Sequence, residues 1–265
     1  MIIRVLGCHG SELTIEDGNG RTRECRTCGF LVNETCMVDA GSVSAGLLEA
    51  EQGKIRHVLL SHAHFDHIKG LPLLADNLVG RNLPHGPVQV RALPEVLDDL
   101  RRHIFNDVVF PDFTRLPTPD TAPLAYHPFE EEKAFTFDHL EVTAVRVSHI
   151  VPTTGFIIRE RDTALLYSGD TAETKRIWEI AAKEPRLKAA FIETSFPNDF
   201  HELAKVSGHL TPEMLAREFV KIGRPDLPLY IYHLKPSYHS VITSELKRLN
   251  LPNLSVLEEG QVVRL

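Results

Sequence analysis

The sequence has no apolar run long enough to cross a membrane. Its first apolar run, Met1 to Gly7, is too short for a signal peptide and is typical of a first β-strand. Basic residues are in the minority, with 29 Lys and Arg against 36 Asp and Glu, and the formal net charge is −7. That balance argues against nucleic-acid binding through bulk electrostatics. We therefore expect a cytoplasmic protein that contacts no membrane and does not depend on nucleic acid as a partner.

Cysteine is scarce and confined to the N-terminal region, at Cys8, Cys25, Cys28 and Cys36. Cys25 and Cys28 form one CxxC pair without a second pair of similar form. A structural zinc shared with Cys8 and Cys36 is one interpretation, and a redox pair is another. In a cytosolic chain, reduced thiols without a special role are more common than either. We assign the four cysteines no function.

The length of 265 residues and the hydrophobic content of 43% are ample for a core, and nothing marks a domain boundary. We therefore expect a single domain over residues 1–265. The polar stretch from Ser11 to Arg23 is expected to be a loop, and Phe30 to Val32 and Cys36 to Asp39 predict a hairpin with its turn at Asn33. Strands followed by helices recur twice along the chain. This predicts an α/β fold, a four-layer αββα sandwich with helices outside two facing sheets.

The segment 59–70 holds three histidines and an aspartate within six residues, directly after an apolar run that predicts a buried strand. In an extended chain, residues two apart point to the same side, so His62 and His64 can bind one ion. Asp66 and His67, at the start of the next helix, face another way and suit a second ion. Imidazole and carboxylate ligands favour zinc, manganese, iron or nickel, and no thiolate lies nearby to favour a closed structural zinc site.

Residues Leu60 to Gly70 resemble the HxHxDH signature of the metallo-β-lactamase-fold hydrolases. The rest of that pattern is an isolated His, an Asp after a strand and a last His after a strand, and all three occur in order. The resemblance implies a metal-dependent hydrolase with two divalent metal ions, with zinc expected and manganese or iron as alternatives. One ion would be bound by His62, His64 and His149, the other by Asp66, His67 and His233, and Asp170 would bridge both. Asp39 would support the metal loop from behind, and a simple turn carboxylate is the alternative.

Two further motifs resemble the phosphodiesterase branch of this family, which tRNase Z and the class II cyclic-nucleotide enzymes share. Phe191 to Phe196 resembles its Glu-centred strand end, and Ser207 to Pro212 resembles its Gly-His helix start. A His at a helix start, held by a carboxylate, can bind a phosphate oxygen or protonate a leaving alkoxide. The resemblance implies that His209, oriented by Glu193, is the proton donor. A structural carboxylate and a helix-cap residue are the alternatives.

The closer resemblance is to class II 3′,5′-cyclic-nucleotide phosphodiesterases, and it extends from the N-terminal strand to the last helix. It is carried by residues 187–198, 208–212 and 232–236. No basic, Gly- and Pro-rich arm of the kind tRNase Z carries is visible, and the net acidity disfavours a long polyanion. Gly7 to Gly10 and the cysteine pair depart from the usual lead-in of the family.

The resemblance implies that a hydroxide held between two ions attacks the cyclic phosphate of cAMP or cGMP and leaves a 5′-nucleotide. Asp66 would accept a proton from the nucleophile while binding metal. The small-molecule cyclic nucleotide is then the partner, and a homodimer is expected because relatives are usually dimers. A tRNase Z-like or other phosphodiesterase, a lactonase or thioester hydrolase, and a non-catalytic nucleotide sensor are the alternatives.

The segment His103 to Phe113 is rich in aromatic residues and is broken by Pro111. It is either a loop that caps the core or a lid that stacks a flat ligand, because aromatic faces suit a nucleobase. It also resembles a Phe-Asn and Pro-Asp-Phe run of the class II enzymes. The resemblance implies that Phe105, Asn106 and Phe113 bind the substrate together with His209.

Overall fold

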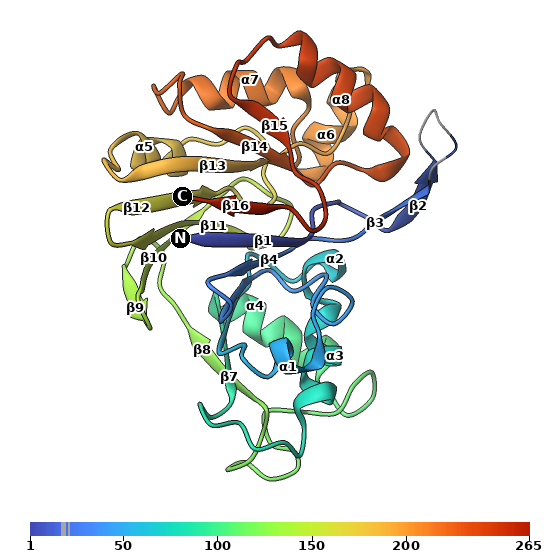
Figure 1. Ribbon diagram of the computed structural model, residues 1–265, viewed down its shortest axis with the longest axis vertical. Coiled ribbons are helices and arrows are strands. Elements are labelled where there is room, and N and C mark those ends of the chain that lie inside the picture. The colour runs from blue at the N-terminus through green and yellow to red at the C-terminus, as the bar shows by residue number, and fades with distance from the viewer. Residues whose placement is uncertain (17–19, 21) are drawn as a thin grey trace.

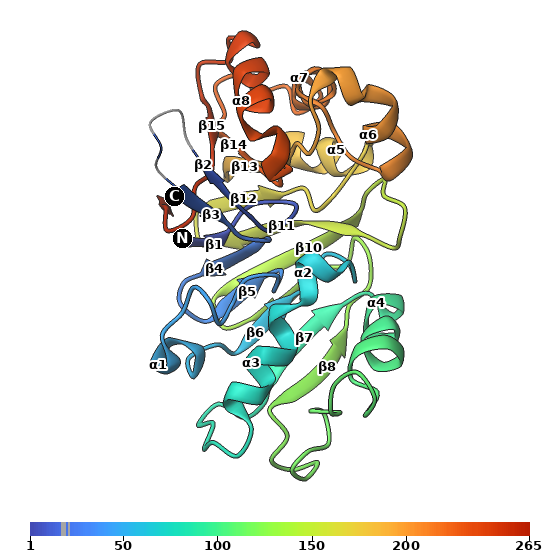
Figure 2. The same ribbon diagram turned by 90° about the vertical axis from the view of Figure 1, so that its right-hand side faces the viewer.

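The computed structural model describes every residue except 17–19 and 21. Two seven-stranded sheets face each other, and helices cover the outer side of each sheet (Figure 1 and Figure 2). This is the four-layer αββα sandwich that the sequence predicts. Among the described residues, no helix combines the length and the apolarity that a membrane crossing requires.

The first sheet has the strand order β16-β1-β4-β5-β6-β7-β8, in which β5 to β8 run parallel. Its strands are β1 (Ile2–Gly7), β4 (Gly29–Val32), β5 (Cys36–Val38), β6 (His57–Leu59), β7 (Val88–Ala92), β8 (Leu124–Pro128) and β16 (Val262–Arg264). The helices on its outer side are α1 (Glu49–Gln52), α2 (Phe65–Ile68), α3 (Gly70–Leu78) and α4 (Pro94–Asp99), and α4 continues into a π-helical turn, Leu100–Ile104.

The second sheet has the order β15-β14-β13-β12-β11-β10-β9, in which β12 to β15 run parallel. Its strands are β9 (Phe135–Phe137), β10 (Leu140–Arg146), β11 (Thr154–Glu160), β12 (Thr163–Tyr167), β13 (Leu187–Glu193), β14 (Leu229–Tyr232) and β15 (Leu254–Val256). The helices of this half are α5 (Arg176–Ala182), α6 (His201–Ser207), α7 (Pro212–Val220) and α8 (His239–Arg248), with short 3₁₀ turns at Asn198–Phe200 and Pro236–Tyr238.

The core between the sheets is centred on aromatic side chains. The ring of Phe30 on β4 lies edge-on to Tyr167, Phe191 and Tyr232 of the second sheet, at centroid distances of 5.6, 5.7 and 5.4 Å. Such edge-to-face pairs add about 0.5–1.5 kcal/mol each beyond the burial of their area. A second apolar cluster, which includes Trp178, lies between the second sheet and its helices. The two sheets are thereby held at a fixed separation.

The expected hairpin is confirmed, because β4 and β5 pair antiparallel around a turn in which Asn33 and Glu34 have φ angles of 48° and 64°. The expected loop from Ser11 to Arg23 is wrong where the structure describes it. Strands β2 (Leu13–Glu16) and β3 (Thr22–Cys25) pair antiparallel and extend from the sandwich (Figure 1). Both strands are largely exposed, and the alternation of Leu13 and Ile15 with polar residues in β2 is too short to stand out from the polar stretch around it. Residues 17–19 and 21 of the expected loop lie outside the described residues.

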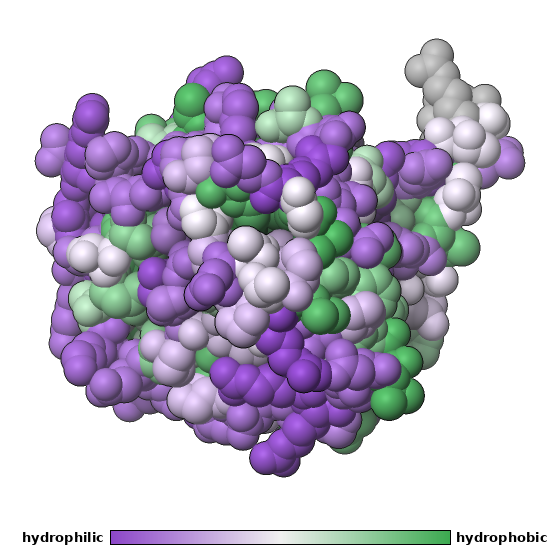
Figure 3. Space-filling model, turned by 90° about the horizontal axis from the view of Figure 1, so that it is seen from below, coloured by the Kyte–Doolittle hydropathy of each residue, from purple (hydrophilic) through white to green (hydrophobic). Residues whose placement is uncertain are grey.

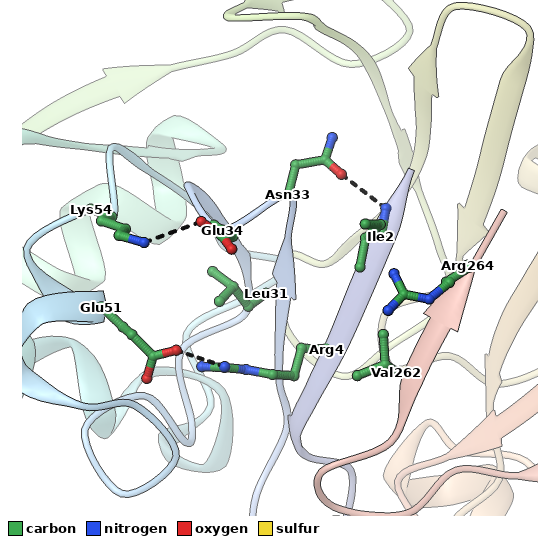
Figure 4. A pocket seen from close by; sticks show the side chains of 9 residues that line it. All are labelled: Ile2, Arg4, Leu31, Asn33, Glu34, Glu51, Lys54, Val262 and Arg264. Carbon is green, nitrogen blue, oxygen red and sulfur yellow. Dashed lines mark hydrogen bonds and ion pairs between the residues drawn. The ribbon is translucent and has the colours of Figure 1, made fainter.

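Seen from the side of α3 and α4, the surface is mostly hydrophilic, and hydrophobic side chains gather along one margin (Figure 3). A cavity of about 460 Å³ opens beside β1, β4 and β16 and is lined by Arg4, Leu31, Glu51 and Arg264, among others (Figure 4). None of the residues that line this cavity belongs to the predicted site, which lies at the C-terminal ends of other strands.

Candidate metal centre and active site

The seven predicted metal ligands come together at one edge of the sandwich. They follow the C-terminal ends of strands from both sheets, where loops are free to carry polar side chains. His62 and His64 follow β6, Asp66 and His67 lie in α2, and His149, Asp170 and His233 follow β10, β12 and β14. Asp170 is central, since its Oδ2 atom lies 3.1 Å from Nε2 of His233, 3.3 Å from Nε2 of His67 and 3.7 Å from Nε2 of His62.

The first group of ligands has the geometry of a cation site. Donor atoms of His62, His64, His149 and Asp170 all lie within 4.8 Å of one another. Nε2 of His149 is 3.2 Å from Nδ1 of His64. Nε2 of His62 and Oδ1 of Asp170 are buried and have no hydrogen-bond partner among the described residues. Buried polar atoms are normally paired, so these lone pairs fit a divalent cation.

The second group is formed by Asp66, His67 and His233 around the same Asp170. Nε2 of His67 lies 3.2 Å from Nε2 of His233, and Oδ2 of Asp66 lies 3.3 Å from that same His233 atom. Nitrogen and carboxylate donors therefore converge twice, on either side of one shared carboxylate. Two adjacent divalent ions fit this arrangement, as expected for metallo-β-lactamase-fold hydrolases.

Electrostatics prepares most of these ligands for a cation. Burial lowers the pKa of His62 well below its usual value and lowers the pKa of His64 to about 4. Burial alone would raise the pKa of Asp170, but the imidazoles of His233 and His67 hold it well below its usual range. These residues are therefore neutral imidazoles and a charged carboxylate at neutral pH, the forms that bind metal.

His67 differs from His62 and His64. Burial opposes its charged form, but the carboxylates of Asp170 and Asp39 outweigh burial and raise its pKa well above the usual value. The cluster therefore attracts positive charge strongly enough to hold a proton on a buried imidazole. A bound cation would satisfy the same carboxylates and displace that proton.

Asp39 supports the metal loop from behind, as the resemblance implies. It is fully buried, and its Oδ1 accepts a hydrogen bond from the Ser61 amide at 2.7 Å. Its Oδ2 accepts hydrogen bonds from Ser61 Oγ at 2.8 Å, from His67 Nδ1 at 2.7 Å and from Tyr167 Oη at 2.5 Å. A turn carboxylate would not need these partners. Tyr167, on the opposite sheet, could not be anticipated from the local sequence.

The backbone of Gly208 positions His149. Nδ1 of His149 donates a hydrogen bond of 2.8 Å to the Gly208 carbonyl, which leaves Nε2 facing the other ligands. Gly208 ends α6 with a φ of 76°, and a Cβ atom placed on it would lie 2.6 Å from Nδ1 of His149. Glycine is therefore required here both by the backbone conformation and by the close approach of the imidazole.

The predicted pair of His209 and Glu193 lies beside this centre. Nδ1 of His209 donates to Oε1 of Glu193 at 2.8 Å and lies 4.0 Å from Oδ2 of Asp170. Burial disfavours the charged imidazole, but the Glu193 carboxylate outweighs it and raises the pKa of His209. The Thr171 amide donates to Oε1 of Glu193 at 3.1 Å, so the carboxylate is itself held in place.

Ser195 is a site residue that sequence reasoning missed. Its Oγ donates to Oε2 of Glu193 at 3.0 Å and accepts a hydrogen bond of 2.8 Å from Nδ1 of His233. One hydroxyl thus links a predicted metal ligand to the carboxylate that orients His209. The sequence did contain one indication of this role: Ser195 lies two residues after Glu193, and in an extended chain two such residues point to the same side.

The predicted substrate residues lie in different surroundings. Phe105 and Phe113 belong to the core, with at most 4% of either residue exposed, and their ring centroids are 6.5 Å apart. The Asn106 side chain accepts hydrogen bonds from the amides of Val108 and Val109 in its own turn. This burial favours the core-capping interpretation of the segment, and base binding by these residues stays a prediction.

The sequence places no cysteine beside the metal loop, but the fold brings one close to it. Sγ of Cys28 on the loop before β4 lies within 4.8 Å of donor atoms of His67 and His233. The thiol is fully buried, and burial raises its pKa well above the usual value. Cys36 stands at the opposite end of β5 from Asp39, so the four cysteines are not gathered into one zinc site. Strand pairing, which the local sequence does not show, brings Cys28 to the ligands.

The sandwich with histidines and aspartates at one edge defines a class, the hydrolases of the metallo-β-lactamase fold. The chain belongs to this family, because the model of the beta-lactamase superfamily domain matches residues 38–230. It is 28% identical over 227 residues to a protein from Yersinia pestis named probable 3′,5′-cyclic-nucleotide phosphodiesterase, covering 74% of this chain and 63% of that relative. It is 34% identical over 110 residues to ribonuclease Z from Pseudomonas putida, covering 40% of this chain and 30% of that enzyme.

Among solved structures, the unliganded yeast PDE1 superimposes with a TM-score of 0.80 at 20% identity, covering 100% of this chain and 99% of that chain. At this identity the likeness concerns the fold. The chain spans about 63% of the length of the Yersinia relative, so the substrate of that relative is not transferred directly.

Proposed function

We propose that this protein is a phosphodiesterase with two divalent metal ions that hydrolyses 3′,5′-cyclic nucleotides, cAMP or cGMP, to 5′-nucleotides. The observation that carries the proposal is the buried pair of Glu193 and His209, whose atoms lie 2.8 Å apart beside Asp170. A β-lactamase has no need of such a proton donor, because its leaving group differs. The name of the Yersinia relative supports the same substrate class.

The ions, with zinc expected and manganese or iron as alternatives, would be held by the two groups of ligands that share Asp170. When bound, they would supply Lewis-acid stabilisation of the phosphoryl oxygens and an activated water. Asp66 would accept a proton from that water, since its side chain is one quarter exposed while the other ligand carboxylate, Asp170, is buried. Asp39, Ser195 and the Gly208 carbonyl would fix the rings of His67, His233 and His149.

His209 would protonate the departing ribose 3′-oxygen. Glu193 accepts the Nδ1 proton of His209, so Nε2 is the nitrogen left to face the substrate. A positioned general acid of this kind contributes about 10²–10⁴-fold to the rate. Because Glu193 is fixed by the Thr171 amide and by Ser195, the imidazole plane is set before the substrate arrives.

The test is to incubate zinc-loaded protein with 3′,5′-cAMP and to identify the product by chromatography. We expect 5′-AMP, and a loss of about 10²–10⁴-fold in turnover for His209→Ala with unchanged zinc content. His139→Ala, on the exposed turn before β10, is the matched control and should retain full turnover. Absence of turnover with both cAMP and cGMP would overturn the substrate claim.

A tRNase Z-like activity is the second candidate, and the similarity to ribonuclease Z over 110 residues favours it. It predicts cleavage of precursor tRNA with cyclic nucleotides inert. A lactonase or thioester hydrolase would also use the metal centre, but it would not need His209. In that case His209→Ala would retain nearly full turnover on the acyl substrate.

A further inference from the structure

A second group of metal-binding side chains lies outside the site described above. Donor atoms of Cys8, His9 and Glu259 all lie within 4.8 Å of one another. Sγ of Cys8 is 3.7 Å from Nδ1 of His9, and that nitrogen is 2.6 Å from Oε1 of Glu259. Cys8 and His9 are 2% and 1% exposed, so these two donors lie inside the protein, and the side chain of Glu259 is 14% exposed.

One atom of this cluster lacks a partner. Oε1 of Glu259 accepts hydrogen bonds from Nδ1 of His9 and from the Arg26 amide, the latter at 2.9 Å. Oε2 of Glu259 is buried and makes no hydrogen bond to any residue that the structure describes. A buried carboxylate oxygen without a partner costs free energy that a cation would recover.

The three donors match the chemistry of zinc. Thiolate, imidazole and carboxylate bind zinc at about 2.3, 2.0–2.1 and 2.0–2.2 Å in a tetrahedral arrangement. Two donors at these lengths lie about 3.4–3.6 Å apart, close to the observed separation of Cys8 and His9. Nδ1 of His9 and Oε1 of Glu259 are hydrogen-bonded at 2.6 Å. An ion bound to both would require them to move apart by about 0.8 Å.

We propose that Cys8, His9 and Glu259 form a structural site for zinc or another thiophilic divalent cation, separate from the centre around Asp170. The site would fasten three segments that meet at the end of β1, namely residues 8–9, the backbone at Arg26 and the turn before β16 (Figure 1). The proposal does not depend on the reaction that the protein catalyses.

The site would also stiffen one side of the predicted catalytic centre. The amide of His233 donates a hydrogen bond of 2.6 Å to the carbonyl of Cys8, and His9 forms a β-bridge with Leu234. His233 has a φ of 69°, a conformation that a non-glycine residue keeps only where its surroundings enforce it. A cation bound to Cys8 and His9 would fix the segment 8–9, whose contacts with His233 and Leu234 maintain this backbone conformation.

The first test is metal content. Wild type and two variants, Cys8→Ser and Cys36→Ser, are saturated with zinc, freed of excess zinc and assayed by elemental analysis. Cys36 is also buried but belongs to no metal-binding group among the described residues, so Cys36→Ser is the matched control. We expect Cys8→Ser to bind one zinc fewer per chain than both other proteins. Equal content in all three would overturn the proposal.

The second test uses cobalt(II), whose thiolate complexes absorb in the near ultraviolet through charge transfer. We expect that band in wild type and in Cys28→Ser and its loss in Cys8→Ser. A band that survives Cys8→Ser but disappears in Cys28→Ser would place the thiolate at the catalytic centre and overturn the proposal. Thermal unfolding in excess chelator is the control for misfolding of the variant. Without bound ions, wild type and Cys8→Ser should have the same unfolding temperature.

Discussion

The Nδ1–H group of His67 donates a 2.7 Å hydrogen bond to Oδ2 of Asp39, and both side chains are fully buried. The bond fixes the tautomer that turns Nε2 of His67 toward Asp170. Contacts of this kind to a ligating histidine typically change metal affinity about 10–100-fold. We therefore expect Asp39→Asn to weaken zinc binding by that factor, measured by competition with a chelator. The control is Asp138→Asn, a partly exposed carboxylate paired with Arg56, and equal affinities in both variants would contradict the prediction.

Gly208 and Gly223 have similar backbone conformations, so a comparison of the two can distinguish the effect of backbone strain from the effect of the contact with His149. Gly208 and Gly223 have φ angles of 76° and 69°, but a Cβ atom on Gly208 would collide with His149, whereas on Gly223 it meets open space. Each alanine variant should lose about 1–2 kcal/mol of stability from the left-handed conformation. Only Gly208→Ala should also bind zinc more weakly, because it displaces His149. Matching zinc affinities in the two variants would show that the carbonyl contact does not position the ligand.

The burial of Phe105 predicts a stability effect rather than a binding effect. Phe105→Ala should lower the free energy of unfolding by about 3–5 kcal/mol, because it leaves a cavity in the core. Val108→Ala, at an exposed position in the same segment, should change it by less than about 0.5 kcal/mol. Denaturant unfolding measures both values, and KM for cAMP should be unchanged in Phe105→Ala. A raised KM with native stability would instead support the base-binding role implied by the resemblance.

His57 should make the protein sensitive to acid. Burial, against the ring of Phe137, lowers its pKa to about 4, below the value near 6.5 of the unfolded chain. Between these values the unfolded chain binds more protons, so stability falls as the pH falls, by at most about 1.4 kcal/mol per pH unit for this group.

In excess chelator, His57→Gln should therefore show a shallower decline of stability from pH 6.5 to 4 than wild type, measured by urea unfolding at each pH. His139→Gln, at an exposed position, should follow wild type. Parallel curves for wild type and His57→Gln would exclude His57 as the source of the decline.

The sequence predicted the αββα architecture and the gathering of the seven candidate ligands. His62, His64, Asp66 and His67 lie within six consecutive residues, in the loop after β6 and the start of α2, so their spacing in the sequence was enough to predict them. His149, Asp170 and His233 each follow a strand, and parallel strands bring their C-terminal ends to the same edge. For Asp39 the sequence left two interpretations, a residue that supports the metal loop and a simple turn carboxylate. Its four hydrogen bonds favour the supporting role.

What the sequence did not predict depends on contacts between distant segments. Cys28 meets His67 and His233 only through strand pairing, and Cys8 meets Glu259 across 251 positions of the chain. A segment rich in aromatic residues has the same composition whether its rings bind a ligand or pack in the core. The composition around Phe105 and Phe113 therefore could not distinguish a lid from a loop that caps the core. In β2, Leu13 and Ile15 alternate with polar residues, but an alternation over four residues does not stand out from the polar segment around it.

The hydrogen bond from Tyr167 to Asp39 crosses from one sheet to the other, and the ligands are divided between the same two sheets. Neither half of the sandwich can therefore bind the ions alone. The affinity for the ions depends on how closely the two sheets pack against each other. A substitution in the aromatic core, such as Phe30→Leu, would therefore change the metal affinity although it alters no ligand. Zinc affinity can thus serve as an internal gauge of core packing in this protein.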